Sequence, residues 1–305
     1  MISKKVLLFA AVCLLLSSCG QKAAAPDSSP PAVEISLPSA ANTAPEPESG
    51  GTDAVPPGEA GNPASDEAPA EEQTPPEPPA SLYHINKAYN VAPNEEGTEK
   101  KVVLLTFDDG PKEEEMIDGL IDTLDKHHAK AIFFVNGYRV KAHPELLTLI
   151  HDRGQIIGNH SWDHIDLKKE TPENARKQVE DVQIIVEQTI GERPRFFRPP
   201  FGSGNDALHQ IVEENGMIYM TWSNGSLDWD SKNKNKPDAV IQNVMDQLHA
   251  GSNILMHELP WTVEALDELL TKLEAKGYGF VDPATIGEVP KDEGAGEAAA
   301  GGSGK

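Results

Sequence analysis

Long apolar runs are missing from this sequence. The longest one, VLLFAAVCLLL at residues 6–16, has about a dozen residues, whereas a membrane-spanning helix needs roughly 20. It follows Lys4 and Lys5. A short positive segment followed by a short apolar segment is typical of a secretory signal, which is removed from the mature protein. The sequence therefore predicts an exported protein.

Cysteine is also scarce, with two residues in 305. Cys13 lies inside the predicted signal, and Cys19 ends the tetrapeptide LSSC, which resembles the bacterial lipobox. The resemblance implies a lipoprotein signal peptide at residues 1–18, lipidation of Cys19, and an extracellular protein anchored by lipid to the cell membrane of a bacterium. An ordinary signal that happens to contain Cys19 is the alternative. In the mature lipoprotein no thiol would remain for a disulfide or a cysteine-ligated metal.

Aromatic and basic residues are nearly absent from residues 19–80. Pro, Ala, Glu, Ser and Gly dominate there, and eleven acidic residues stand against the single Lys22. Such a segment cannot bury enough apolar surface to offset the entropy of ordering it, so we predict a disordered linker. Nearly half of the net charge of −23 lies in it. We therefore attribute the acidity to the linker and expect no nucleic-acid partner.

The remaining sequence predicts one folded α/β domain at 81–288, followed by a disordered tail at 289–305. Seven runs rich in apolar residues predict strands at 102–107, 131–135, 155–158, 195–198, 217–222, 253–257 and 278–281. Segments of helical period lie between them, at 113–128, 143–154, 172–191, 237–251 and 262–277. Such alternation predicts a parallel sheet with helices outside, as either a barrel or an open doubly wound sheet.

Polar clusters at the strand ends favour the barrel. DDG, NHSWDH, RPPFG and SNGSLDW each follow a predicted strand, and His257 ends another. A barrel brings the carboxyl ends of all its strands to one face, whereas an open sheet gathers only the loops near its switch point. The fold class predicted is therefore a distorted or incomplete (β/α) barrel of about seven parallel strands.

The first cluster, Asp108-Asp109-Gly110, admits two interpretations. Asp-Gly-Pro is turn chemistry in its own right. However, two adjacent carboxylates beside a buried strand raise each other's pKa unless a cation is near. A divalent metal ion would remove that cost, and we prefer this interpretation.

His160 and His164 supply the further ligands that such an ion needs. The pair stands on a strand-to-loop turn and lacks the adjacent Glu of the helical zinc-protease motif. Two imidazoles and one carboxylate leave coordination positions open, which suits a catalytic zinc or a similar ion. Non-haem iron oxygenases use the same ligand set, but the β-α alternation argues against their usual antiparallel fold. Hydrolysis is therefore preferred.

Five motifs, TFDDGP, HSWDH, RPPFG, LDW and LMH, occur in this order between residues 102 and 282. In order and spacing they resemble the motifs of the polysaccharide deacetylases, carbohydrate esterase family 4, also called the NodB-homology domain. The resemblance covers essentially the whole predicted domain. It implies a metal-dependent hydrolase that removes N-acetyl groups from sugars of a polysaccharide.

The resemblance also implies residue roles. Asp109, His160 and His164 would bind the divalent metal ion, with zinc preferred and cobalt, nickel or manganese as alternatives. Asp108 would be the general base that takes a proton from the attacking water, and His257 the general acid that protonates the departing amine.

Two partners would tune these groups. Arg198 would pair with Asp108 and hold it ionised, and Asp228 would hydrogen-bond His257 and favour its protonated form. A surface ion pair for Arg198 and a loop cap for Asp228 are the alternatives.

Three residues are implied to contact the substrate. The backbone N–H of Phe201 would stabilise the oxyanion, and Trp229 and Leu255 would line the pocket for the acetyl methyl, with core packing as the alternative for both. The chain also departs from the family pattern, because Gly225 stands where the fourth motif often has Asp. This departure leaves the substrate group open.

Peptidoglycan is the expected substrate, through its N-acetylglucosamine or N-acetylmuramic acid, because the predicted linker would carry the domain away from the bilayer to the cell-wall glycan. Deacetylation of chitin oligosaccharides and O-acetyl xylan esterase activity are the enzymatic alternatives. A non-catalytic cell-wall-binding lipoprotein is the alternative from another class.

Overall fold

The computed structural model describes residues 80–288. The predicted signal peptide, the lipidation site Cys19, the linker up to residue 79 and the tail at 289–305 lie outside the described residues. Within 80–288, no helix is long and apolar enough to cross a membrane.

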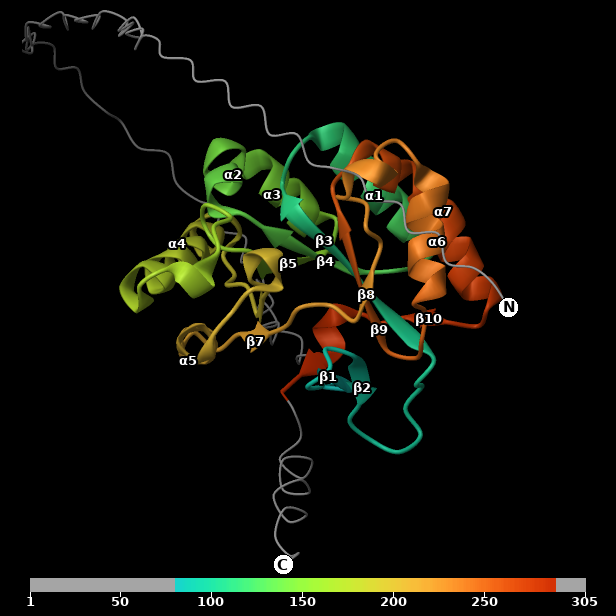
Figure 1. The fold of residues 1–305 in the computed structure, drawn as a ribbon, viewed down its shortest axis with the longest axis horizontal. Helices are drawn as coiled ribbons and strands as arrows, with labels where there is room; N and C mark the ends of the chain where they lie inside the picture. Colours follow the sequence, from blue (N-terminus) through green and yellow to red (C-terminus); the bar gives the residue numbers. More distant parts are fainter. Residues whose placement is uncertain (1–79, 289–305) are drawn as a thin grey trace, which may run out of the picture. The chain divides into compact units, whose positions relative to one another are not determined.

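Helices and strands alternate through most of this region (Figure 1). The strands are β1 (Tyr83–Ile85), β2 (Val91–Pro93), β3 (Val102–Gly110), β4 (Ala131–Val135), β5 (Ile156–Asn159), β6 (Phe196–Phe197), β7 (Ile218–Tyr219), β8 (Asn224–Gly225), β9 (Ser252–His257), β10 (Gly279–Phe280) and β11 (Ile286–Gly287). The α-helices are α1 (Glu114–Lys126), α2 (Gly137–Ala142), α3 (Pro144–Asp152), α4 (Pro172–Ile190), α5 (Asp206–Glu214), α6 (Pro237–Asp246) and α7 (Pro260–Ala275). Short 3₁₀ turns lie at Leu167–Lys169, Pro200–Gly202, Ser231–Asn233 and Pro283–Thr285.

The main sheet is a parallel half-barrel. Its strands follow the order β7-β6-β5-β4-β3-β9-β8, and β10 pairs with the first residues of β3. The terminal strands β7 and β8 do not pair with each other, so the barrel is incomplete. The predicted fold class is therefore confirmed.

Alternation along the strands separates two apolar layers. On β3, Val103, Leu105 and Phe107 are fully buried and belong to the cluster beneath the helices. Leu104 faces the other side and packs in the interior cluster that also contains Phe134 of β4. Burying a side chain of this size stabilises the fold by about 1.5–3 kcal/mol. Successive residues point to opposite faces of a strand, so one apolar run builds both layers.

The helices use amphipathic faces to cover the outside of the sheet. In α1 the buried side chains are Ile117, Leu120, Ile121 and Leu124, a spacing of three and four that forms one stripe. The longest helix, α4, begins with Thr171 accepting a hydrogen bond from the Asn174 N–H and ends at Gly191, whose φ of 80° places it in the left-handed region.

A second, small sheet in the order β11-β1-β2 is absent from the sequence prediction. It lies at the amino ends of the barrel strands, because Val91 N donates to Gly251 O just before β9 and Arg195 Nη2 donates to Ile286 O just before β6. It joins residues about 200 positions apart in the sequence. Such short strands carry no periodicity of their own, so only their tertiary pairing defines them.

Three further elements were also missing from the prediction: β8, α2 and α5. The two residues of β8, Asn224 and Gly225, have low strand propensity, so the sequence predicts a loop there. The helix α2 has only six residues, too few for a periodic signal. The predicted strand at 217–222 ends at Tyr219 in the structure, so the residues that follow belong to the loop that leads to β8.

Candidate active site

The carboxyl ends of the strands surround a pocket of about 390 Å³. It is lined by Asp108, Asp109, His160, His164, Phe201, Trp222, Trp229, Leu255 and His257. These residues come from six strand ends of the half-barrel, those of β3, β5, β6, β7, β8 and β9, so the polar clusters converge as the sequence predicts. Arg198 and Asp228 lie behind the lining and contact it through hydrogen bonds.

A β-bulge aims two adjacent carboxylates at the same pocket. In the β3–β4 register Asp108 lies opposite Phe134 and Gly110 opposite Val135, so Asp109 is an extra residue without a partner. Its φ of 66° is left-handed, a conformation that Asp tolerates better than most residues. In a regular strand neighbouring side chains point to opposite faces. The bulge removes that alternation, and both carboxylates reach the pocket.

The loop that carries the two histidines is held by buried side-chain hydrogen bonds. Asn136 Nδ2 donates to His160 O at 2.8 Å, and Gln178 Oε1 accepts from the Asp163 N–H at 2.8 Å. Ser161 and His164 adopt left-handed φ angles of 66° and 54°, so the loop folds back and returns His164 to the side of His160. The pair is therefore not helical, as its position after a strand predicted.

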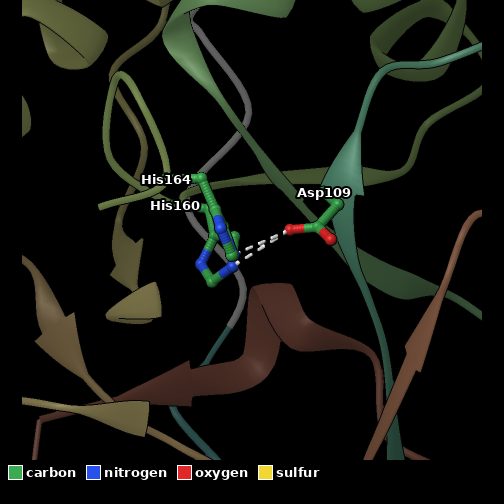
Figure 2. Close-up of side chains that lie close together, drawn as sticks. All are labelled: Asp109, His160 and His164. Atoms are coloured by element: carbon green, nitrogen blue, oxygen red, sulfur yellow. Dashed lines mark ion pairs between the residues drawn. The ribbon is translucent and has the colours of Figure 1, made fainter. Parts of the chain in front are cut away.

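Asp109 faces both imidazoles (Figure 2). Its Oδ1 lies 3.1 Å from His164 Nε2 and 3.5 Å from His160 Nε2. The three potential ligand atoms lie within 4.8 Å of one another. Burial raises the pKa of the Asp109 carboxyl, but the nearby imidazoles of His160 and His164 outweigh that effect and hold the pKa well below its usual range. The carboxyl is therefore ionised at neutral pH.

The chemistry of these three groups fits a divalent metal ion. His160 Nδ1 lies 2.7 Å from the carbonyl oxygen of Arg198. A carbonyl only accepts, so Nδ1 carries the proton and, in the neutral ring, Nε2 presents a lone pair towards Asp109. Asp109 Oδ1 is buried and has no hydrogen bond of good geometry within the described residues. A lone pair and an anionic oxygen that face each other in this way favour a cation between them.

Arg198 holds Asp108 from inside the barrel. Its side chain is 0% exposed, and Nη1 donates to Asp108 Oδ1 and to Thr106 Oγ1, both at 2.7 Å. Nη2 donates to Asn253 Oδ1 at 3.1 Å. The guanidinium binds Oδ1 of Asp108. The other carboxylate oxygen, Oδ2, faces the pocket and lies 3.7 Å from His160 Nε2. The alternative of a surface ion pair for Arg198 is therefore wrong.

Asp228 holds His257 in a similar way. The carboxylate is fully buried; Oδ1 accepts from His257 Nδ1 at 2.8 Å, and Oδ2 accepts from the His257 backbone N–H and from Thr262 Oγ1, both at 2.7 Å. Burial lowers the pKa of His257, but the hydrogen bond and the negative charge of Asp228 more than offset this, so the pKa is raised. The other ring nitrogen of His257, Nε2, faces the pocket, and the raised pKa favours the protonated imidazolium form of the ring.

Aromatic side chains form the mouth of the pocket. Phe201 is 66% exposed, Trp229 is 44% exposed, and Leu255 is buried at 3%. Phe201 has a left-handed φ of 61°, and its N–H donates no hydrogen bond within residues 80–288. Trp222, which lies 6.3 Å from Trp229 between ring centroids, also lines the pocket.

Sequence reasoning missed Trp222 and the buried supports Thr106, Asn136, Asn253 and Thr262. The sequence predicts a strand that includes Trp222, but the strand in the structure ends three residues earlier. The supports are ordinary polar residues in apolar surroundings, and an alternating inward pattern, such as Asn253, Leu255 and His257 on β9, is the one signal that could have indicated Asn253.

Comparisons with known proteins agree with this site. The family model for polysaccharide deacetylases matches residues 95–220. Over 215 residues the chain is 36% identical to the peptidoglycan-N-acetylmuramic acid deacetylase PdaC of Bacillus subtilis, in an alignment that covers 70% of this chain and 44% of PdaC. The peptidoglycan-N-acetylglucosamine deacetylase of Bacillus cereus is 33% identical over 199 residues, covering 63% of this chain and 70% of that relative. The chain belongs to the polysaccharide deacetylase family, carbohydrate esterase family 4.

Membership of the polysaccharide deacetylase family does not by itself establish catalysis. A CE4 family pseudoenzyme from Bacillus anthracis is 32% identical in a structural match with a TM-score of 0.56, which covers 63% of this chain and 64% of the other. The chain also spans less than half the length of PdaC. Activity must therefore be inferred from the residues of this chain and their geometry.

Proposed function

We propose that this protein is a metal-dependent N-deacetylase of peptidoglycan. The observation that carries the proposal is the content of one pocket: three potential ligand atoms within 4.8 Å, a carboxylate paired with a buried arginine, and a histidine paired with a buried aspartate. A non-catalytic wall-binding protein would have no need to keep two buried charged partners behind its surface, because buried charges cost several kcal/mol unless they are well paired.

Asp109, His160 and His164 would hold the divalent metal ion, with zinc preferred. When bound, the ion would acidify water and polarise the acyl carbonyl. All remaining steps belong to side chains and backbone of the chain. Asp108 is suited to accept the proton of the attacking water through Oδ2, because Oδ1 is already occupied by Arg198.

Residues on the other side of the pocket would stabilise the oxyanion and protonate the leaving group. The free N–H of Phe201 would donate to the developing oxyanion. His257 Nε2 would protonate the amine nitrogen as the C–N bond breaks, while Asp228 stabilises the imidazolium. Acetate and a free amino sugar are the products, and water supplies the oxygen.

The cell-wall glycan is the substrate that the relatives support. PdaC and the Bacillus cereus relative are named for N-acetylmuramic acid and N-acetylglucosamine of peptidoglycan, respectively.

We further propose that the protein acts outside the cell and is anchored in the membrane by lipid on Cys19. A Cys19→Ser variant should then leave the membrane fraction and appear in the medium. Retention of that variant in the membrane would contradict the anchor.

The test of the function combines metal analysis with acetate release from a panel of glycans. Wild-type protein should bind about one metal ion per chain and release acetate from purified peptidoglycan. Asp108→Asn should keep the metal and lose activity by about 10²–10⁴-fold, the usual contribution of an acid-base group. His160→Ala should lose both metal and activity.

Each outcome of this test decides one part of the proposal. Full turnover by Asp108→Asn would refute the assigned base. Acetate release from chitin oligosaccharides or acetylated xylan alone would refute peptidoglycan as the substrate. Metal binding without acetate release from any glycan would identify the chain as a pseudoenzyme.

A further inference from the structure

Gly225 lies beside Trp222 and Trp229 of the pocket lining, at a position where the backbone does not require glycine. It lies in β8 and pairs in parallel register with Leu255 of β9. It is not among the glycines with a positive φ. Glycine within a strand costs about 0.5–1 kcal/mol relative to alanine, so its presence here calls for another physical reason.

The missing side chain would point into the barrel. Asn224, the preceding residue, donates from Nδ2 to Val244 O in α6 and therefore faces the helices. Neighbouring residues of a strand face opposite sides, so Gly225 faces the interior, beside the inward-pointing Leu255.

A methyl group would fit at this position. A Cβ on Gly225 would lie 3.5 Å from Trp229 Cη2, 3.7 Å from Trp222 Nε1 and 3.9 Å from Leu227 Cδ2, all ordinary contact distances. Neither crowding nor conformation therefore excludes a side chain. Without a side chain, room for about one methyl group is left next to Trp222 and Trp229, two residues that line the pocket.

The direction of the substrate indicates which part of it reaches this space. The reacting carbonyl carbon must lie near Asp109 and the two histidines, and the sugar must remain towards the mouth that exposed Phe201 marks. The substituent on the carbonyl carbon then points inward, towards Leu255. Trp222 Nε1 borders the same space, 3.7 Å from where a Cβ on Gly225 would lie, so it can donate to a polar atom there.

We propose that this pocket accepts N-acyl groups one heavy atom larger than acetyl, and in particular the N-glycolyl group of an amino sugar. The hydroxyl of the glycolyl group would occupy the space at Gly225 and accept a hydrogen bond from Trp222 Nε1. The proposal rests on the proposed function. The reaction is the same hydrolysis: water adds to the carbonyl carbon, the C–N bond breaks, and glycolate and a free amine leave.

The test compares kcat/KM of the metal-loaded protein on glucosamine oligomers that differ only in the acyl group: N-acetyl, N-propionyl and N-glycolyl. Wild type should hydrolyse all three within about 10-fold of one another. Gly225→Ala should lower the propionyl-to-acetyl and glycolyl-to-acetyl ratios by at least about 10-fold, since one methylene of mismatch in an apolar pocket changes rates by about 10–200-fold.

Two further variants separate the parts of the proposal. Gly279→Ala is the matched control, because that strand glycine also has room for a Cβ, 3.7 Å from Val102 Cγ1, but lies outside the pocket lining; its ratios should equal those of wild type. Trp222→Phe should lower the glycolyl-to-propionyl ratio, because it removes the N–H donor and keeps an aromatic ring.

A binding measurement distinguishes failure of this inference from failure of the proposed function. Glycolate and acetate binding to the metal-loaded protein can be followed by the fluorescence of Trp222 and Trp229, and Gly225→Ala should weaken glycolate more than acetate. If wild type hydrolyses the N-acetyl substrate but neither the N-propionyl nor the N-glycolyl one, the inference is overturned and the proposed function still holds. No hydrolysis of any substrate would refute the function, and equal glycolate affinity in wild type and Gly225→Ala would then overturn the inference as well.

Discussion

At the scale of the residue, three side chains of the pocket share one arrangement: one polar atom is hydrogen-bonded to a neighbouring residue, and the other faces the pocket. His160 uses Nδ1 on the Arg198 carbonyl, Asp108 uses Oδ1 on the Arg198 guanidinium, and His257 uses Nδ1 on Asp228. Committing one atom fixes the tautomer or orientation of the group. The atoms left over, Nε2, Oδ2 and Nε2, are those that the proposed chemistry uses.

The first prediction concerns His257 and Asp228. The proposed general acid must be protonated, so kcat/KM should fall as the pH rises through the His257 pKa, which lies above the usual 6.5. Asp228→Asn removes the charge that raises this pKa, so the basic limb of the pH profile should move to lower pH and the rate at pH 8 should fall by roughly 100-fold.

Thr262→Val is the control for this change, because it removes one hydrogen bond to Asp228 Oδ2 and leaves the carboxylate charge in place. Its basic limb should stay close to that of wild type. A limb that does not move in Asp228→Asn would show that another group sets it.

At the scale of the element, the bulge in β3 is held from behind by the loop after β9. Glu258 is fully buried, and its Oε2 accepts from the Lys112 N–H at 2.8 Å. A Cβ on Gly110 would lie 1.9 Å from Glu258 Oε1. Any side chain at Gly110 would therefore force the buried Glu258 carboxyl to move.

Gly110→Ala should consequently disturb the bulge. We expect a loss of about 1–3 kcal/mol in the free energy of unfolding, the usual cost of overpacking, together with weaker metal binding because Asp109 is displaced. Urea denaturation and metal titration measure the two effects. Gly279→Ala, which meets only Val102 Cγ1 at 3.7 Å, should change neither quantity, and a Gly110→Ala protein as stable and as metal-avid as wild type would contradict this role of the bulge.

At the scale of the whole molecule, the half-barrel joins ligands that are far apart in sequence. Asp109 comes from the end of β3, and His160 and His164 come from the loop after β5. An ion that bridges them would bind the folded chain and not the unfolded one, so it would stabilise the fold by mass action.

Metal removal should therefore lower the melting temperature. At a free metal concentration of about 100 times Kd the stabilisation is about 2.7 kcal/mol, which for a domain of this size corresponds to roughly 5–10 °C. Calorimetry with and without a chelator measures the shift. His160→Ala should melt at the same temperature in both conditions, and a wild-type protein that is insensitive to the chelator would contradict a metal site of this affinity.

Much of this organisation could be predicted because it depends on patterns that are local in sequence. Apolar runs long enough to be buried predicted β3, β4 and β9, and stripes at helical spacing predicted α1 and α4. The polar clusters at the strand ends indicated the pocket, since parallel strands of a barrel present their carboxyl ends on one face. Of the elements that escaped, β8, α2 and the small sheet are too short to carry a period. The helix α5 does carry one, because its buried Leu208, Ile211 and Val212 form a stripe at helical spacing, and the sequence prediction overlooked it.

The fold class and the candidate site residues could be inferred from the chain alone, because hydrophobic period and residue chemistry are properties of the chain. The orientation of those side chains, in contrast, depends on the tertiary structure. The bulge at Asp109, the pairing of Asp108 with the buried Arg198, and the position of Gly225 beside Trp222 of the pocket lining all depend on contacts between distant segments. No local pattern encodes such contacts, because they exist only once the strands have paired.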